Sequence, residues 1–183
     1  MSRREAMSER PWSVLVALHE VPETGRHLEL AADERARAAI ARLAGLRNLP
    51  RLHAVFDVTL RGRDGLRVVG SVSATVGQTC VVTLEPIENE IEEAIDLVFA
   101  PPPPSLVEDG NERTEVRPAD APEPLTGGVV DLGALATEFL ILGIDPYPRK
   151  PDAVFAGSSV GDSPANPFAA LAALKKKQGG SEG

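Results

Sequence analysis

The sequence has little of the chemistry that most often reveals an enzyme or a metalloprotein. Only 4% of its 183 residues are aromatic, three are histidines and one, Cys80, is a cysteine. A single cysteine excludes an intrachain disulfide and a zinc site built from cysteines, and it agrees with a reducing compartment. The 43% of hydrophobic residues are enough for a core. Because so few of them are aromatic, we expect that core to be built mainly from Val, Leu, Ile and Ala.

Catalytic and nucleotide-binding signatures are missing as well. The sequence contains no P-loop, no Gly-x-Gly-x-x-Gly, no His-Glu-x-x-His and no nucleophile elbow. His19, His27 and His53 lack the spacing of metal ligands. A catalytic pair of Cys80 with a histidine stays open, although no spacing supports it. We therefore predict a protein that is not an enzyme, with no catalytic residue, no metal and no cofactor.

No segment predicts contact with a membrane. The first 13 residues carry no apolar run that could form the core of a signal peptide. Nowhere does the sequence hold about 18 consecutive apolar residues, the length that a spanning helix needs. We expect a cytoplasmic protein.

Acidic and basic residues are segregated along the chain. The net charge is −8, but residues 1–80 hold 12 basic and 9 acidic side chains, residues 81–145 hold 2 and 15, and residues 146–183 hold 5 and 3. The overall charge argues against a protein that coats nucleic acid without selectivity. The two ends are basic enough to contact RNA, while the acidic middle suits a basic protein surface.

Three long strands are the most definite structural prediction. Apolar and polar residues alternate over residues 52–60, Asp64-Gly65 favours a hairpin turn, and the alternation returns over residues 66–76. Residues 87–99 alternate again and place Glu88, Glu90 and Glu92 on one face. The isoleucines of this segment also fit a helix, but its β-branched residues favour a third antiparallel strand. Residues 81–84 could continue the sheet.

The N-terminal region predicts two further strands and a helix. Residues 12–18 have the apolar character of a buried strand, and residues 26–30 alternate like a second one. Asp33 can cap a helix over residues 34–44. Ala36, Ile40 and Leu43 would then face the core.

A second helix is expected over residues 132–142, with Asp131 as its N-cap. Its inward stripe comprises Leu132, Leu135, Phe139 and Leu142. Gly143 suits a left-handed C-terminal cap, and Asp145-Pro146 prevents continuation of the helix. The prolines that follow predict a stiff, extended, basic strip.

Together these elements predict an α+β fold. We expect an antiparallel sheet, a long meander that could be strongly curled, covered by two or three helices. Residues 1–11 are expected to be disordered and residues 12–155 to form one domain, with a flexible acidic loop at about 101–126. Residues 156–183 would be a flexible tail with a short helix, because Asn166-Pro167 is a favourable helix start and three lysines follow the apolar run FAALAAL.

Three groups of residues are candidates for contact with RNA or a partner. Tyr147, Arg149 and Lys150 combine a ring for stacking with two cations on a proline-rich strip, although the strip could instead only pack the helix end. Arg35 and Arg42 on the first helix could add a basic face or could simply be solvated. Glu88, Glu90 and Glu92 could contact a basic protein or form a solvated face.

Two segments resemble the YceD family of large ribosomal RNA subunit accumulation proteins. One runs from Asp131-Leu132-Gly133 to Tyr147-Pro148-Arg149-Lys150-Pro151 and is similar to the family's apolar helix followed by a Tyr-Pro-Arg strip. The other, Cys80 with Leu84-Glu85-Pro86, resembles the family's Cys-x-x-Cys-Leu-x-Pro segment. The tail from Asn166 to Leu171 followed by lysines is also similar. Thr83 stands where the second cysteine would be, which puts any metal or redox role of paired cysteines in doubt.

The resemblance implies a non-enzymatic role in the accumulation of 23S ribosomal RNA and in large-subunit biogenesis. The implied partner is 23S rRNA or the pre-ribosomal large subunit. The alternative is an acidic adaptor that holds a basic ribosomal protein without touching RNA. The resemblance implies one YceD-like domain. Because the second cysteine is missing, Cys80 is expected to be a small packing residue near a strand end.

Overall fold

A five-stranded open sheet forms the body of the structure. The computed structural model describes residues 10–101 and 121–154. The strand order is β2-β3-β4-β5-β6, with bounds as follows: β2 Arg26–Ala31, β3 Asn48–Arg61, β4 Gly65–Thr79, β5 Pro86–Ala100 and β6 Glu123–Pro124. Neighbouring strands are antiparallel except β5 and β6, which are parallel. The predicted α+β class, the hairpin at Asp64-Gly65 and the third long strand are confirmed.

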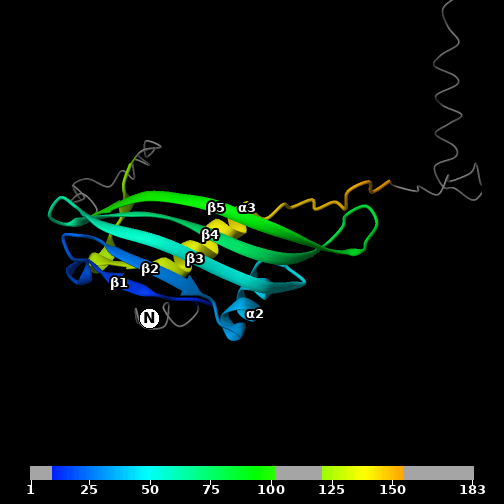
Figure 1. Cartoon of the computed structure of the whole chain (residues 1–183), viewed down its shortest axis with the longest axis horizontal. Coiled ribbons are helices and arrows are strands. Elements are labelled where there is room, and N and C mark those ends of the chain that lie inside the picture. Colours follow the sequence, from blue (N-terminus) through cyan, green and yellow to red (C-terminus); the bar gives the residue numbers. More distant parts are fainter. Residues whose placement is uncertain (1–9, 102–120, 155–183) are drawn as a thin grey trace, which may run out of the picture.

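Two helices cover the apolar face of this sheet. Helix α3, Leu132–Gly143, crosses strands β4 and β5, and helix α2, Glu34–Leu43, packs on β3. Figure 1 shows α3 running behind the long strands and α2 near the start of β3. The alternation in the sequence decides which side is buried, because successive strand residues point to opposite faces. The largest fully buried side chains are aliphatic apart from Phe56.

Both helices begin at the predicted aspartates. The Asp33 carboxylate accepts a hydrogen bond from the Ala36 N–H at 2.7 Å, and Asp131 accepts one from Ala134 at 3.1 Å. These bonds satisfy first-turn N–H groups that have no partner within the helix. The N-terminal boundaries of both helices could therefore be predicted from the sequence.

The N-terminal strand differs from the prediction. Only Leu15–Ala17 forms a strand, β1, and it pairs with β7, Val129–Asp131, in a separate two-stranded sheet. A 3-10 turn, Leu18–Glu20, ends β1. The side chain of Asp131 explains the pairing, because it accepts hydrogen bonds from the backbone of Val14 and from the hydroxyl of Ser13. The first strand is therefore held beside the start of α3, and of the two predicted N-terminal strands only β2 joins the main sheet.

Four other details of the prediction are wrong, and one of them is Leu142, which was expected in the inward stripe of α3 but is 72% exposed. Residues 81–84 form a turn, closed by hydrogen bonds from Leu84 N to Cys80 O and from Cys80 N to Glu85 O, both at 2.9 Å. Leu43 is 63% exposed because α2 ends there. Gly143 remains helical, and its lack of a Cβ serves close packing: a Cβ there would lie 2.6 Å from Oε1 of Glu93 on β5.

Some predictions fall outside the described residues. They include the tail helix after Asn166 and most of the acidic loop predicted for residues 101–126. The described end of that loop contains β6, which pairs with Phe99 and Ala100 at the end of β5. The N–H of Leu125 continues this pairing with a 2.7 Å hydrogen bond to the carbonyl of Ala100.

Candidate contact surface

The strip after α3 lies against the turn that joins β4 to β5. The N–H of Val81 donates to the carbonyl of Pro148 at 2.9 Å, and the side chain of Gln78 donates to the carbonyl of Asp145 at 2.9 Å. Pro148 is buried in this contact. Figure 1 shows the chain leaving α3 toward the end of the sheet that carries this turn. The backbone of the strip is thus held at both of its ends.

Cys80 is a central anchor of the strip. Its Sγ atom accepts hydrogen bonds from the backbone N–H of Lys150 at 3.3 Å and of Thr83 at 3.4 Å. The Thr83 hydroxyl, followed by these backbone donors, lowers the pKa of the Cys80 thiol to about 6, although burial raises it. Cys80 therefore does more than the packing expected for it, since as a thiolate it would hold two segments together.

The side chains of the strip differ in their environments. Tyr147 is 70% exposed. Lys150 forms a 2.9 Å ion pair with Glu85, and this hydrogen bond lowers the pKa of the Glu85 carboxyl. Arg149 is exposed and has no ion pair within the described part of the chain. Of the two predicted cations, Arg149 is therefore the less engaged by the protein's own side chains.

The predicted arginines of the first helix lie elsewhere. Arg35 and Arg42 are exposed on α2 and line a groove of about 600 Å³ together with Arg10 and Trp12. Helix α2 packs on β3, whereas the strip docks on the β4–β5 turn. The two basic groups of candidate residues therefore lie on two separate surfaces of the structure. Arg10 was missed because its role depends on the distant Asp131, which it contacts at 3.0 Å.

Arg47 is a further basic residue that the sequence reasoning missed. It is exposed, and its N–H donates to the carbonyl of Gly77 at 2.8 Å. The next residue of β4, Gln78, holds Asp145 at the start of the strip. Arg47 therefore lies at the same end of the sheet as Arg149. The signal in the sequence was weak, since it is one arginine just beyond a helix end.

The acidic residues of β5 share a face, as predicted, but one of them is engaged. The carboxylate of Glu90 is 2.6 Å from the Thr75 hydroxyl and 2.6 Å from the guanidinium of Arg51, and these contacts lower its pKa. Glu88 and Glu92 are exposed. Arg51 also donates to the Ser73 hydroxyl, so its side chain links β3, β4 and β5. The pairing of Glu90 with Arg51 could not be predicted without the strand register.

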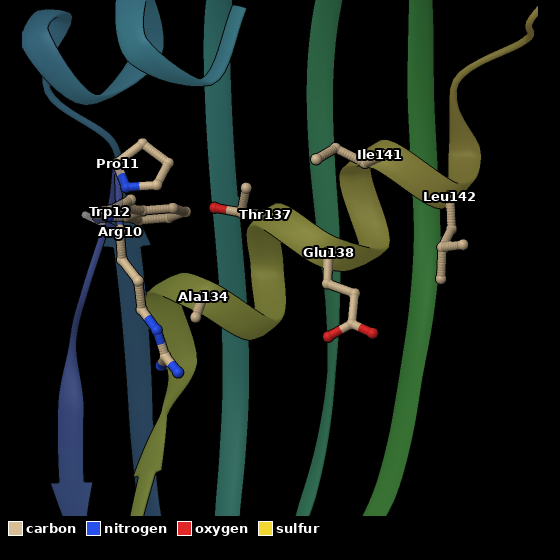
Figure 2. Close-up of a pocket in the computed structure, with 8 residues that line it drawn as sticks. All are labelled: Arg10, Pro11, Trp12, Ala134, Thr137, Glu138, Ile141 and Leu142. Carbon is tan, nitrogen blue, oxygen red and sulfur yellow. The ribbon is translucent and has the colours of Figure 1, made fainter. Parts of the chain in front are cut away.

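An apolar groove lies on the outer side of α3. Its volume is about 380 Å³, and Figure 2 shows its lining: Arg10, Pro11, Trp12, Ala134, Thr137, Glu138, Ile141 and Leu142. The α3 residues among them recur every three or four positions, so they form one stripe of the helix. In Figure 2 the Trp12 ring points toward this stripe.

Other kinds of site are not found in the described residues. Residues 10–101 and 121–154 contain no group of three or more His, Cys, Asp or Glu residues arranged for a metal ion. Within the same two ranges, no helix combines the length and hydropathy of a transmembrane span.

Comparison with known proteins identifies a family. Residues 68–175 match the family model described as large ribosomal RNA subunit accumulation protein YceD. The match begins in β4 and includes the Cys80 turn, the acidic strand, α3 and the strip. No curated protein and no solved structure matches the chain.

Proposed function

The chain belongs to the YceD family of large ribosomal RNA subunit accumulation proteins, and we propose that it promotes accumulation of 23S rRNA by contacting that RNA through the strip. In this proposal it acts in the cytoplasm as an assembly factor and not as an enzyme. The candidate contact residues are Tyr147 and Arg149, with Lys150 in a supporting position.

The observation that carries the proposal is the exposure of the Tyr147 ring beside Arg149, a cation with no ion pair among the described residues, on an anchored backbone. Tyr147 is 70% exposed, and its N–H is bonded to Oδ1 of Asp145 at 2.8 Å. Aromatic side chains stack on unpaired bases, and arginine binds phosphate through parallel hydrogen bonds. Because the backbone is already ordered, little conformational entropy is lost when RNA binds.

The charge distribution favours a local contact over a broad one. The net charge of −8 opposes binding through many phosphates, since each contact requires a basic side chain. The strip lies at the same end of the sheet as Arg47, while Arg10, Arg35 and Arg42 form the separate surface at α2. We therefore expect recognition of a single-stranded or looped segment, whose bases are accessible.

The deciding experiment measures binding of the full chain to fragments that tile 23S rRNA. One fragment should bind with an affinity that falls as salt rises, and crosslinking should place the contact at Tyr147. A 16S rRNA fragment of equal length serves as the control. Absence of binding to every 23S fragment at low salt would refute the proposal.

A protein-binding role is the second candidate, supported by one observation. Glu88 and Glu92 are exposed on the solvent side of β5, whereas Glu90 is paired with Arg51. A basic ribosomal protein would therefore contact the first two. Charge reversal of Glu88 and Glu92 should abolish its capture, and charge reversal of Glu23 and Glu34, two exposed glutamates outside β5, is the matched control. Capture that survives the double reversal would exclude this role.

A further inference from the structure

Helix α3 is apolar on both of its sides. Leu132, Leu135, Ala136 and Leu140 are buried toward the sheet. On the opposite side, Ile141 is 37% exposed and Leu142 is 72% exposed, and both line the groove in Figure 2. A helix that is apolar around its whole circumference is normally covered on all sides. The described residues leave this side of α3 open.

We propose that the groove is the docking site of the chain's own segment 166–175, folded as a third helix. The segment has a favourable helix start in Asn166-Pro167. Phe168, Leu171 and Leu174 follow at intervals of three, so they fall on one side of a helix. An amphipathic helix that lays such a stripe into an apolar groove is a common mode of recognition.

Charge complementarity supports this occupant. Lys175, Lys176 and Lys177 follow the apolar stripe, and Glu138 is exposed at the groove. Lysines at a helix C-terminus also interact favourably with the helix dipole. Arg10, the cation that lines the groove, is already paired with Asp131 at 3.0 Å, so an acidic segment would gain less there than a basic one gains at Glu138.

The chain between Val154 and Phe168 is long enough for the segment to reach the groove. Val154, the last described residue, is 12 positions beyond Leu142, so the two Cα atoms are at most about 43 Å apart. The 14 positions from Val154 to Phe168 can span about 50 Å. Phe168 therefore reaches Leu142 even if the intervening strip is fully extended. Tethering also gives the segment an effective concentration in the millimolar range, well above that of a second chain.

The family match agrees with a structural role for the segment. It extends to residue 175 and so includes Asn166, Phe168, Leu171 and Leu174. The segment therefore belongs to the region that resembles the family and is not an addition to it.

Disulfide trapping in the full chain tests the contact. Leu142→Cys combined with Leu171→Cys should form an intrachain disulfide with oxidised glutathione at least ten times faster than Val55→Cys with Leu171→Cys. Val55 is exposed on the face of the sheet away from α3, so it is a matched control for the same tail position. Cys80 is buried in both variants, and mass spectrometry of the digested protein identifies the pair that has formed.

Each outcome of the trapping decides the proposal. Equal rates for the two pairs would overturn it. A disulfide between two chains, seen as a dimer on a non-reducing gel, would also overturn it and assign the groove to a second copy. A faster intrachain disulfide in the Leu142 pair supports it.

Fluorescence provides a test that needs no new cysteine. Trp12 is the only tryptophan of the chain and lines the groove. Leu171→Glu should shift its emission to the red and raise acrylamide quenching about twofold, because the segment leaves the groove. Ala173→Glu adds the same charge on the opposite side of the expected helix and should change neither quantity. Identical spectra for Leu171→Glu and the unaltered chain would overturn the proposal.

Discussion

The sulfur of Cys80 accepts a hydrogen bond from the backbone N–H of Lys150, 70 residues later in the chain, at 3.3 Å. This contact joins the turn after β4 to the strip after α3. With the bond from Val81 to Pro148, it orders the backbone that carries Tyr147 and Arg149. The cysteine thus supports the candidate contact surface without being exposed to a ligand itself.

Removing the sulfur should loosen the strip selectively. We expect Cys80→Ala to lower the protection of the Lys150 amide against hydrogen exchange and to lower the free energy of unfolding by about 1 kcal/mol, the usual contribution of a hydrogen bond. Cys80→Ser retains an acceptor and should lose less protection. The amide of Arg37, bonded to Asp33 O within α2, is the control and should not change. Equal protection of Lys150 in the alanine variant would contradict this role.

Cys80 should titrate well below an ordinary thiol. The Thr83 hydroxyl and the backbone donors lower its pKa from 9.0 to about 6. The thiolate absorbance near 240 nm should therefore rise with a midpoint near pH 6, and Thr83→Val should move that midpoint upward by removing the largest contribution.

The same shift predicts how stability depends on pH. Between pH 6 and 9 the unfolded chain binds a proton at Cys80 that the folded chain does not, so stability rises with pH across this window. The contribution is complete above pH 9 and is lost as pH falls through 6. Urea unfolding of Cys80→Ser should lack this part of the slope. An unchanged slope would contradict a thiolate at Cys80.

Local patterns were sufficient to predict much of the fold. Period-two alternation identified the three long strands, and Asp33 and Asp131 marked the helix starts, because these signals act over a few residues. Leu142 shows the limit: its spacing placed it in the inward stripe, but α3 is apolar on both sides. Periodicity alone could not decide which side meets the sheet.

The candidate site depended more on distant contacts. Exposure of Tyr147 and Arg149 could be predicted from the prolines around them. The pairing of Lys150 with Glu85 and of Glu90 with Arg51 required the register between segments far apart in sequence. The role of Asp131 in holding β1 was hidden for the same reason.

Substitutions in the strip should separate its two cations. Arg149→Ala should weaken binding to the 23S fragment more than Lys150→Ala, because Lys150 is already paired with Glu85. Tyr147→Ala should cost about 1–3 kcal/mol of binding free energy, the usual contribution of one stacked base. Filter binding over a range of salt concentrations measures both effects. Arg149→Ala should also make the dependence of log affinity on log salt concentration less steep, by the equivalent of about one phosphate contact.

The matched control for these variants is Arg63→Ala. Arg63 is also exposed, but it lies in the β3–β4 turn at the opposite end of the sheet. Its replacement removes one positive charge, as Arg149→Ala does, and should leave the affinity nearly unchanged. Equal losses for Arg63 and Arg149 would indicate general electrostatic attraction and would contradict a site at the strip.

Asp131 should be the more important of the two helix caps. Burial raises the pKa of its carboxyl. The hydrogen bonds that it accepts, first from the backbone N–H groups of Val14 and Ala134, together lower the pKa by more, so the carboxylate is favoured. Its side chain also binds Ser13 and Arg10. Asp131→Ala therefore removes a helix cap, which usually contributes about 1 kcal/mol, and also leaves the Val14 N–H without its acceptor.

We expect Asp131→Ala to lower the free energy of unfolding by about 2–3 kcal/mol in urea. Asp33→Ala removes the cap of α2, whose carboxylate binds one backbone N–H, and should cost about 1 kcal/mol. Because the folded-state pKa of Asp131 is lowered, its contribution is present above the unfolded pKa and is lost as pH falls through the folded one. The difference between the two variants should therefore shrink in strong acid. Equal costs at neutral pH would show that Asp131 acts as a cap alone, with β1 held to α3 by its backbone pairing with β7.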